Sequence, residues 1–167
     1  MKLPELRFGD LVSPLPVIQG GMGVGISMAG LASAVAKEGG VGVIAAAMAG
    51  ITEKDVATNG IEANTRALKR EIRKARANTQ GILGVNIMVA LTNYADMVRT
   101  SIEEGVDIIF AGAGLPLDLP GYLTKGQKTK LVPIISSARA AKILCKKWLK
   151  RYDYLPDGFV VEGPKAG

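Results

Sequence analysis

Short apolar runs and longer amphipathic stretches alternate along almost the whole chain. Six runs have the length and composition of buried strands, at residues 17–19, 41–45, 82–89, 106–110, 131–135 and 159–162. Helical or glycine-rich stretches separate them, as in 61–78, where Ile61, Leu68 and Ile72 fall on one helical stripe. Such alternation predicts a parallel sheet with right-handed crossovers. No linker or composition break interrupts it, so residues 1–167 are expected to form one domain.

Polar residues mark the expected starts of three helices. Ser27, Thr92 and Ser137 each precede a helical stretch, and their hydroxyls are suited to accept hydrogen bonds from its first backbone amides. Glycines follow the first two stretches, at Gly39 and Gly105, as is common where helices end. The crossovers between the strands are therefore expected to be largely helical.

The glycine-rich segment 20–25 argues against a dinucleotide site. That fingerprint needs glycines spaced G-x-G-x-x-G and an acidic residue about 20 positions later. Here the third glycine is misplaced, and the second strand ends in residues 45–47, three alanines with no carboxylate for a ribose. The fingerprint fails, and the alternation fits either another open sheet or part of a (β/α)8 barrel.

The composition excludes several classes of site and partner. The chain has no histidine, which excludes Ser–His–Asp and Cys–His triads and histidine-ligated metals, and its single cysteine, Cys145, fits a reducing cytoplasm. The net charge of +6 comes largely from clusters at 69–76 and 146–151, which are typical of solvated helix faces, so no nucleic-acid partner is expected. The uncharged stretch 11–36 contains prolines and glycines, which argues against a membrane span.

Small and polar residues collect where the expected strands end. Gln19, Gly20, Gly21 and Met22 follow the first strand, Asn86 lies in the third, Gly112 follows the fourth and Glu162 ends the last. In a barrel these carboxyl ends form one face, and small polar residues there suit a planar heteroaromatic ligand held by main-chain contacts. Each feature has a structural alternative, such as a tight turn for the glycines or a backbone partner for Asn86.

Several motifs together resemble the nitronate monooxygenase family, formerly called 2-nitropropane dioxygenases, whose FMN-dependent (β/α)8 barrels also include an enoyl-ACP reductase. The matching segments are PVIQGGMGVGIS (16–27), LASAVAKEGGVGVI (31–44), GVNIMV (84–89), EEGVDIIFAGAGLP (103–116) and VVEGPKAG (160–167). They occur in the family's order over nearly the whole chain. The resemblance implies an α/β fold of the TIM-barrel class, here an incomplete barrel of about six parallel strands.

The resemblance also implies the residues of an FMN site. The backbone of Gln19, Gly20, Gly21 and Met22 is expected to lie against the flavin ring, Asn86 and Glu162 to reach its polar groups, and Gly112 to line the cleft. Gly167 is expected to begin a glycine pair. Family members continue as Ala-Gly-Gly-His, with the histidine as acid or base, so no catalytic residue is expected within this sequence.

The resulting hypothesis is an FMN-dependent oxidoreductase that oxidises alkyl nitronates with O2, inactive as this chain alone. The alternatives are an enoyl-ACP reductase-like enzyme and a non-catalytic fragment or assembly module of a split barrel. In the last case, the edges of the first and sixth strands are unpaired, and exposed edges recruit further strands, so self-association is expected.

Overall fold

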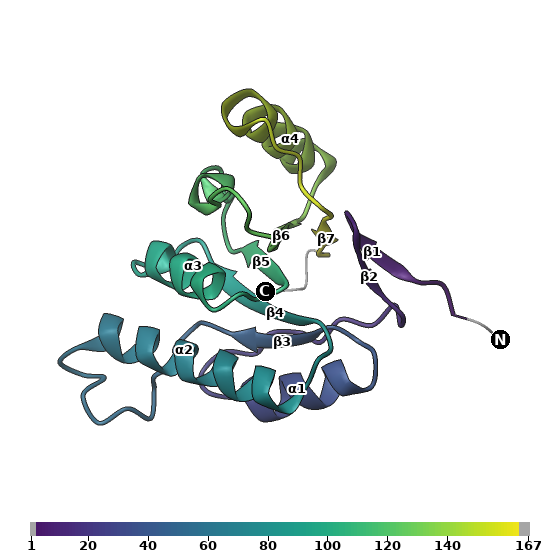
Figure 1. Cartoon of the computed structure of the whole chain (residues 1–167). Helices are drawn as coiled ribbons and strands as arrows, with labels where there is room; N and C mark the ends of the chain where they lie inside the picture. The colour runs from purple at the N-terminus through teal and green to yellow at the C-terminus, as the bar shows by residue number, and fades with distance from the viewer. Residues whose placement is uncertain (1–2, 164–167) are drawn as a thin grey trace.

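The computed structural model describes residues 3–163, which form a curled parallel sheet wrapped by helices (Figure 1). The sheet has the order β3-β4-β5-β6-β7, and every neighbouring pair is parallel. The strands are β3 (Gly42–Ala45), β4 (Leu83–Met88), β5 (Ile108–Gly112), β6 (Lys130–Ile135) and β7 (Val160–Val161). Strands in sequence order with helical crossovers form part of a (β/α)8 barrel, which confirms the predicted fold class.

The first expected strand, 17–19, forms only an isolated parallel bridge between Ile18 and Val41. Its backbone pairing stops at Gln19, whose amide N donates to the Val41 oxygen at 3.0 Å. The Gln19 side chain then continues the pairing, since Nε2 donates to the Val43 oxygen at 2.9 Å and Oε1 accepts from the Val43 amide at 3.2 Å. The structure therefore has five regular parallel strands where about six were expected, and the segment at this edge pairs partly through the Gln19 side chain.

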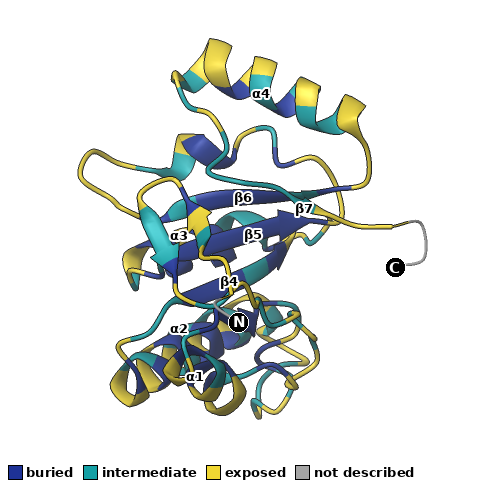
Figure 2. Ribbon diagram, turned by 90° about the vertical axis from the view of Figure 1, so that its right-hand side faces the viewer, coloured by how far each residue is buried: buried dark blue, intermediate teal, exposed yellow. Residues whose placement is uncertain are grey.

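Four helices cover the outer face of the sheet: α1 (Ala29–Lys37), α2 (Gly60–Asn78), α3 (Tyr94–Glu103) and α4 (Ala138–Tyr152). A short 3-10 helix, η1 (Leu119–Tyr122), lies in the loop after β5. Each helix is buried on the side that faces the strands and exposed on the other (Figure 2), and its buried residues are mainly apolar. None of the helices within residues 3–163 is both long and apolar enough to cross a bilayer.

The expected helix starts are borne out to different degrees. Ser137 caps α4, accepting a hydrogen bond from the Ala140 amide at 3.2 Å. The helix expected from Thr92 begins one residue later, with Asn93 as its N-cap. Ser27 is not a cap, because α1 begins after Met28 and the Ser27 hydroxyl bonds to the preceding loop.

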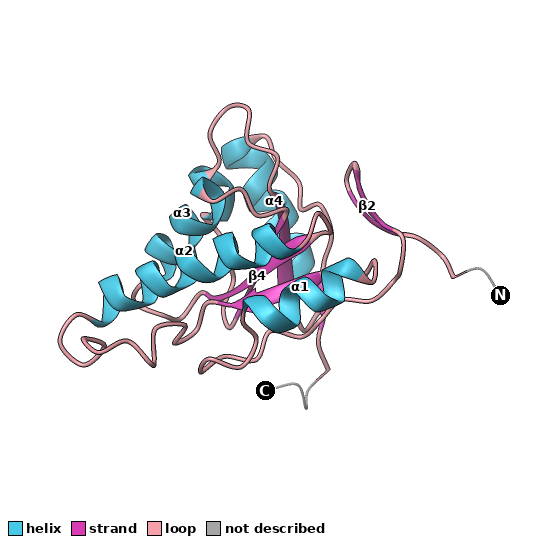
Figure 3. Cartoon of the chain, turned by 60° about the horizontal axis from the view of Figure 1, so that its bottom comes forward, coloured by secondary structure: helices cyan, strands magenta, loops and turns pink. Residues whose placement is uncertain are grey.

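An antiparallel hairpin of β1 (Leu6–Phe8) and β2 (Leu11–Ser13), which was not predicted from the sequence, packs against the inner face of the sheet. It stands apart from the helices (Figure 3). The Phe8 ring packs edge-on against Phe110 of β5, with centroids 6.2 Å apart. Asp10 in the turn pairs with Lys130 at the start of β6. The hairpin therefore closes the inner face at the amino ends of the strands.

Candidate functional site

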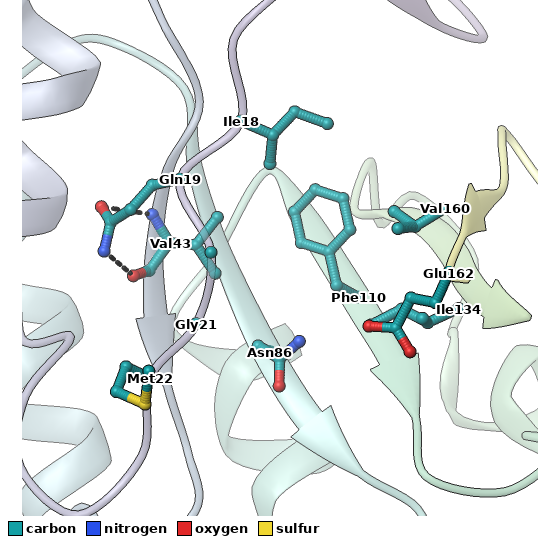
Figure 4. A pocket seen from close by; sticks show the side chains of 11 residues that line it. Ile18, Gln19, Gly21, Met22, Val43, Asn86, Phe110, Ile134, Val160 and Glu162 are labelled. Atoms are coloured by element: carbon teal, nitrogen blue, oxygen red, sulfur yellow. Dashed lines mark hydrogen bonds between the residues drawn. The ribbon is translucent and has the colours of Figure 1, made fainter. Parts of the chain in front are cut away.

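A cavity of about 370 Å³ opens at the carboxyl ends of the strands (Figure 4). Its apolar wall consists of Ile18, Val43, Phe110, Ile134 and Val160. All lie at or next to strands of the sheet, and Val43, Phe110 and Ile134 belong to the inner-face cluster that also holds the hairpin. The volume lies within the range of small-molecule and cofactor sites, and the wall is of the aliphatic and aromatic kind that such sites share.

The polar rim of the cavity contains most of the residues expected from the sequence. Gln19, Gly20, Gly21 and Met22 line it from the edge segment, Asn86 from β4 and Glu162 from the end of β7. These residues are up to 143 positions apart in the chain, and the parallel topology brings them to one mouth because their strands all end there.

Two expected residues stand outside this lining. Gly112 ends β5 beside the wall, and a Cβ added there would lie 2.9 Å from Cβ of Ile134, so its hydrogen makes room for a lining side chain. Gly167 lies outside the described residues.

Gly21 lies directly against Asn86. A Cβ added at Gly21 would come within 2.6 Å of the Asn86 Cβ and 3.0 Å of its Cγ, closer than real Cβ atoms approach. A larger residue at position 21 would therefore push the segment away from β4. The close approach keeps the loop backbone and the Asn86 amide side by side at the mouth (Figure 4).

Asn86 is half-buried on a strand that is otherwise almost entirely apolar. Within residues 3–163 its side-chain amide has no hydrogen-bond partner. The structural alternative, an asparagine satisfied by neighbouring backbone, is therefore not what the structure shows. Because Asn86 lines the open cavity, water or a ligand can complete the hydrogen bonds of its amide.

Glu162 is the charged residue of the lining. Its backbone amide continues the β6–β7 ladder by donating to the Ile135 oxygen at 2.8 Å, while its carboxylate is exposed at the mouth (Figure 4). No lysine or arginine of the described part of the chain lines this cavity. The arrangement suits a mainly neutral, flat ligand that offers hydrogen-bond donors to Glu162 and both kinds of group to Asn86.

The apolar wall was missed in the sequence, although a signal was present. Inward-facing residues alternate along the strands, as in Val41 and Val43, Ile108 and Phe110, or Val132 and Ile134, and the last member of each pair reaches the mouth. Period-two alternation identifies such pairs only once the inner and outer faces are known, because strands covered on both faces are apolar throughout.

Comparisons with known proteins agree with this architecture. A sequence profile described as nitronate monooxygenase matches residues 9–167. Comparison with curated proteins gave no match. The structure of a FabK mutant from Thermotoga maritima aligns with a TM-score of 0.69 and 28% identity, covering 91% of this chain and 43% of that chain. A second FabK structure from this organism has a TM-score of 0.60 and 28% identity, covering 79% and 37%.

A further similar structure is a nitroalkane oxidase from Streptomyces ansochromogenes. It aligns with a TM-score of 0.70 and 19% identity, covering 92% of this chain and 48% of that chain, which is evidence of a shared fold. The chain thus spans less than half of the length of each of these solved structures.

Proposed function

The chain belongs to the nitronate monooxygenase family, and we propose that its mouth cavity binds the flavin ring of FMN. The observation that carries this proposal is that two glycines lie beside the side-chain amide of Asn86, which has no hydrogen-bond partner within residues 3–163. Gly20 and Gly21 expose backbone at the cavity, and Asn86 offers both a donor and an acceptor beside them. The proposal places the chain within an FMN-dependent oxidoreductase.

The residues present fit the ring end of this cofactor. The isoalloxazine is flat and apolar on its faces and has carbonyl, N–H and ring nitrogen groups along one edge. The aliphatic and aromatic wall suits the faces, while Asn86 and Glu162 suit the edge. No cation from the described residues lines the cavity to hold a phosphate, so the fit concerns the ring alone.

The reaction that we propose is oxidation of an alkyl nitronate with O2. When bound, the flavin supplies the electron acceptor and O2 the final oxidant. The chain's own residues would orient the ring through the Gly20–Gly21 backbone and exclude water from one side of it through Val43 and Phe110. We assign no proton-transfer role to any residue of this chain.

A second candidate is reduction of an enoyl thioester, which the family resemblance also implies. Met22, with 61% of its surface exposed beside the cavity, gives an apolar contact suited to an acyl chain. The two candidates differ in their co-substrates, nitronate with O2 in one and NAD(P)H in the other. Oxygen uptake on propyl-2-nitronate and NADPH oxidation with an enoyl thioester distinguish them in the whole protein.

Titration of the purified chain with FMN tests the proposed site. We expect quenching of flavin fluorescence with a Kd tighter than about 1 mM. Asn86→Ala should weaken binding about tenfold, because it removes one polar contact from a largely apolar site. Asn78→Ala, at the exposed end of α2, is the matched control and should bind as the wild type does. A wild-type Kd weaker than about 1 mM would contradict the proposal.

We further propose that this chain self-associates through its sheet edges. Within residues 3–163 no strand pairs with the second side of β7, where Val161 is 72% exposed, and Val17 at the opposite edge is 51% exposed. Open edges with apolar side chains attract further strands. Sedimentation velocity should show dimers or larger species, and Val161→Lys should shift them towards monomer. A monodisperse wild-type monomer would rule this out.

The cellular location that we propose is the cytoplasm. The support is the cysteine content, since the sequence has one cysteine, Cys145, which is half-buried and free. Proteins of reducing compartments commonly keep such cysteines as thiols.

A further inference from the structure

We propose that Ser27 is a positioning residue, which holds the backbone of residues 20–22 in the shape that receives the cofactor. This inference rests on the proposed function, since it concerns the same cavity. Ser27 lies outside the cavity lining, and it acts through the glycine segment that forms part of that lining. Its place before α1 gives it the sequence pattern of a helix cap, a role that its side chain does not perform.

The Ser27 hydroxyl joins two points of the segment. Oγ accepts a hydrogen bond from the Met22 amide at 3.0 Å and donates one to the Gly20 oxygen at 3.3 Å. The side chain is 1% exposed, so water does not compete for these contacts. A hydroxyl is the smallest side-chain group that both accepts and donates, which is what a link between an amide and a carbonyl requires.

The Ser27 backbone fixes the hydroxyl in place. Its amide donates to the Met22 oxygen at 2.9 Å, and its oxygen accepts from the Ala45 amide at 3.0 Å at the end of β3. Both polar backbone groups of Met22 are thus bonded to Ser27. The rigid end of β3 therefore positions Ser27, and Ser27 positions the segment.

A second link, to the turn after β3, also holds the loop. The Val24 amide donates to the Ala47 oxygen at 3.0 Å, and Val24 has a φ of 56°. A β-branched residue rarely adopts this left-handed conformation, and it persists only where surrounding contacts determine it. The Ser27 bonds are among those contacts, since they close the loop on either side of Val24.

The hydrogen bonds of the Ser27 hydroxyl to Gly20 and Met22, which we call the clamp, determine which backbone groups remain available at the cavity. Ser27 occupies the Gly20 oxygen and the Met22 amide, whereas the amides of Gly20 and Gly21 have no partner within residues 3–163. These two donors belong to the part of the segment that lines the cavity. A ligand atom that accepts hydrogen bonds from both amides requires the two N–H groups to keep one orientation. The Ser27 hydroxyl fixes that orientation before the ligand binds.

The test uses Ser27→Ala, which removes the hydroxyl and leaves the backbone bonds. Ser33→Ala is the matched control, because Ser33 is also buried, at 5% exposure, and its hydroxyl bonds to a backbone oxygen, that of Gly30. We expect Ser27→Ala to weaken FMN binding about tenfold and Ser33→Ala to leave the Kd unchanged. Ser27→Cys replaces the hydroxyl by a somewhat larger thiol, which is only a weak donor and a weak acceptor, so it should resemble Ser27→Ala.

A second readout does not depend on FMN. Without ligand, hydrogen exchange at the Met22 amide should become about tenfold faster in Ser27→Ala, because its acceptor is lost. Unchanged exchange would overturn the clamp, as would an unchanged Kd in Ser27→Ala or wild-type binding by Ser27→Cys. If the wild type fails to bind FMN, the proposed function fails, and the exchange experiment still decides whether Ser27 orders the loop.

Discussion

Replacing Gly42 with alanine is expected to destabilise the chain by about 3 kcal/mol or to prevent folding. A Cβ at Gly42 would lie 1.9 Å from the Ala32 oxygen and 2.7 Å from its carbonyl carbon. These are backbone atoms of α1, which move only if the helix shifts. Because Ala29, Ala32 and Ala36 of that helix are themselves fully or almost fully buried, a shift disturbs the packing of the whole crossover.

Gly30→Ala is the matched control for this prediction. Gly30 lies within α1, and a Cβ there meets nothing within 4 Å. Alanine favours the helix over glycine, so this variant should gain up to about 1 kcal/mol. Urea denaturation of both variants measures the difference. Equal midpoints for Gly42→Ala and the wild type would show that α1 does not lie against β3 as closely as described.

Some glycines of this chain line the cavity, and others allow backbone segments to pack closely against one another. A Cβ at Gly81 would lie 2.1 Å from the Ala36 oxygen, so α1 makes a second close approach just before β4. The sequence has 21 glycines, a signal that does not by itself separate a ligand site from close packing. The structure divides that signal, since Gly20 and Gly21 line the cavity while Gly42 and Gly81 let a helix approach the sheet.

The parallel sheet and its helices were predictable because their signal is repeated in every unit. The edge segment and the hairpin were harder to predict, because each has a single local cause. Gln19 replaces backbone pairing with its side chain, and the three-residue strands beside Gly9 are too short to show periodicity. Ser27 shows the same limit, since its position predicts a cap and only the folded loop reveals Met22 as its partner.

The polar rim of the cavity could be predicted because strand ends can be located in a sequence. Asn86 was identified as a polar residue in an apolar strand, and the structure shows it at the mouth without a partner among the described residues. Phe110 could not be assigned to the cavity in this way. It lies in a strand that is apolar on both faces, and its neighbour Phe8 comes from an element that was not predicted.

Phe110→Ala is expected to cost about 3–5 kcal/mol, because it removes a buried ring and leaves a void. The ring is 2% exposed, and its Cε2 lies 2.7 Å from the position of a Cβ at Gly84, so it occupies the space that this glycine leaves on β4. Phe110→Leu keeps most of the volume and should cost about 1 kcal/mol. A loss below 1 kcal/mol in Phe110→Ala would contradict the packing described.

The Phe110 ring contacts the hairpin and also lines the cavity, so removing it should affect both of them. A double-mutant cycle with Phe8→Ala should give a coupling of about 0.5–1.5 kcal/mol, as expected for edge-on aromatic pairs. Phe8 does not line the cavity, whereas Phe110 does. If Phe8→Ala weakens FMN binding, the effect is therefore transmitted through Phe110. If FMN binding is unchanged while the coupling energy is as expected, the hairpin contributes to stability and not to the site. A coupling near zero would mean that the hairpin does not support the inner face.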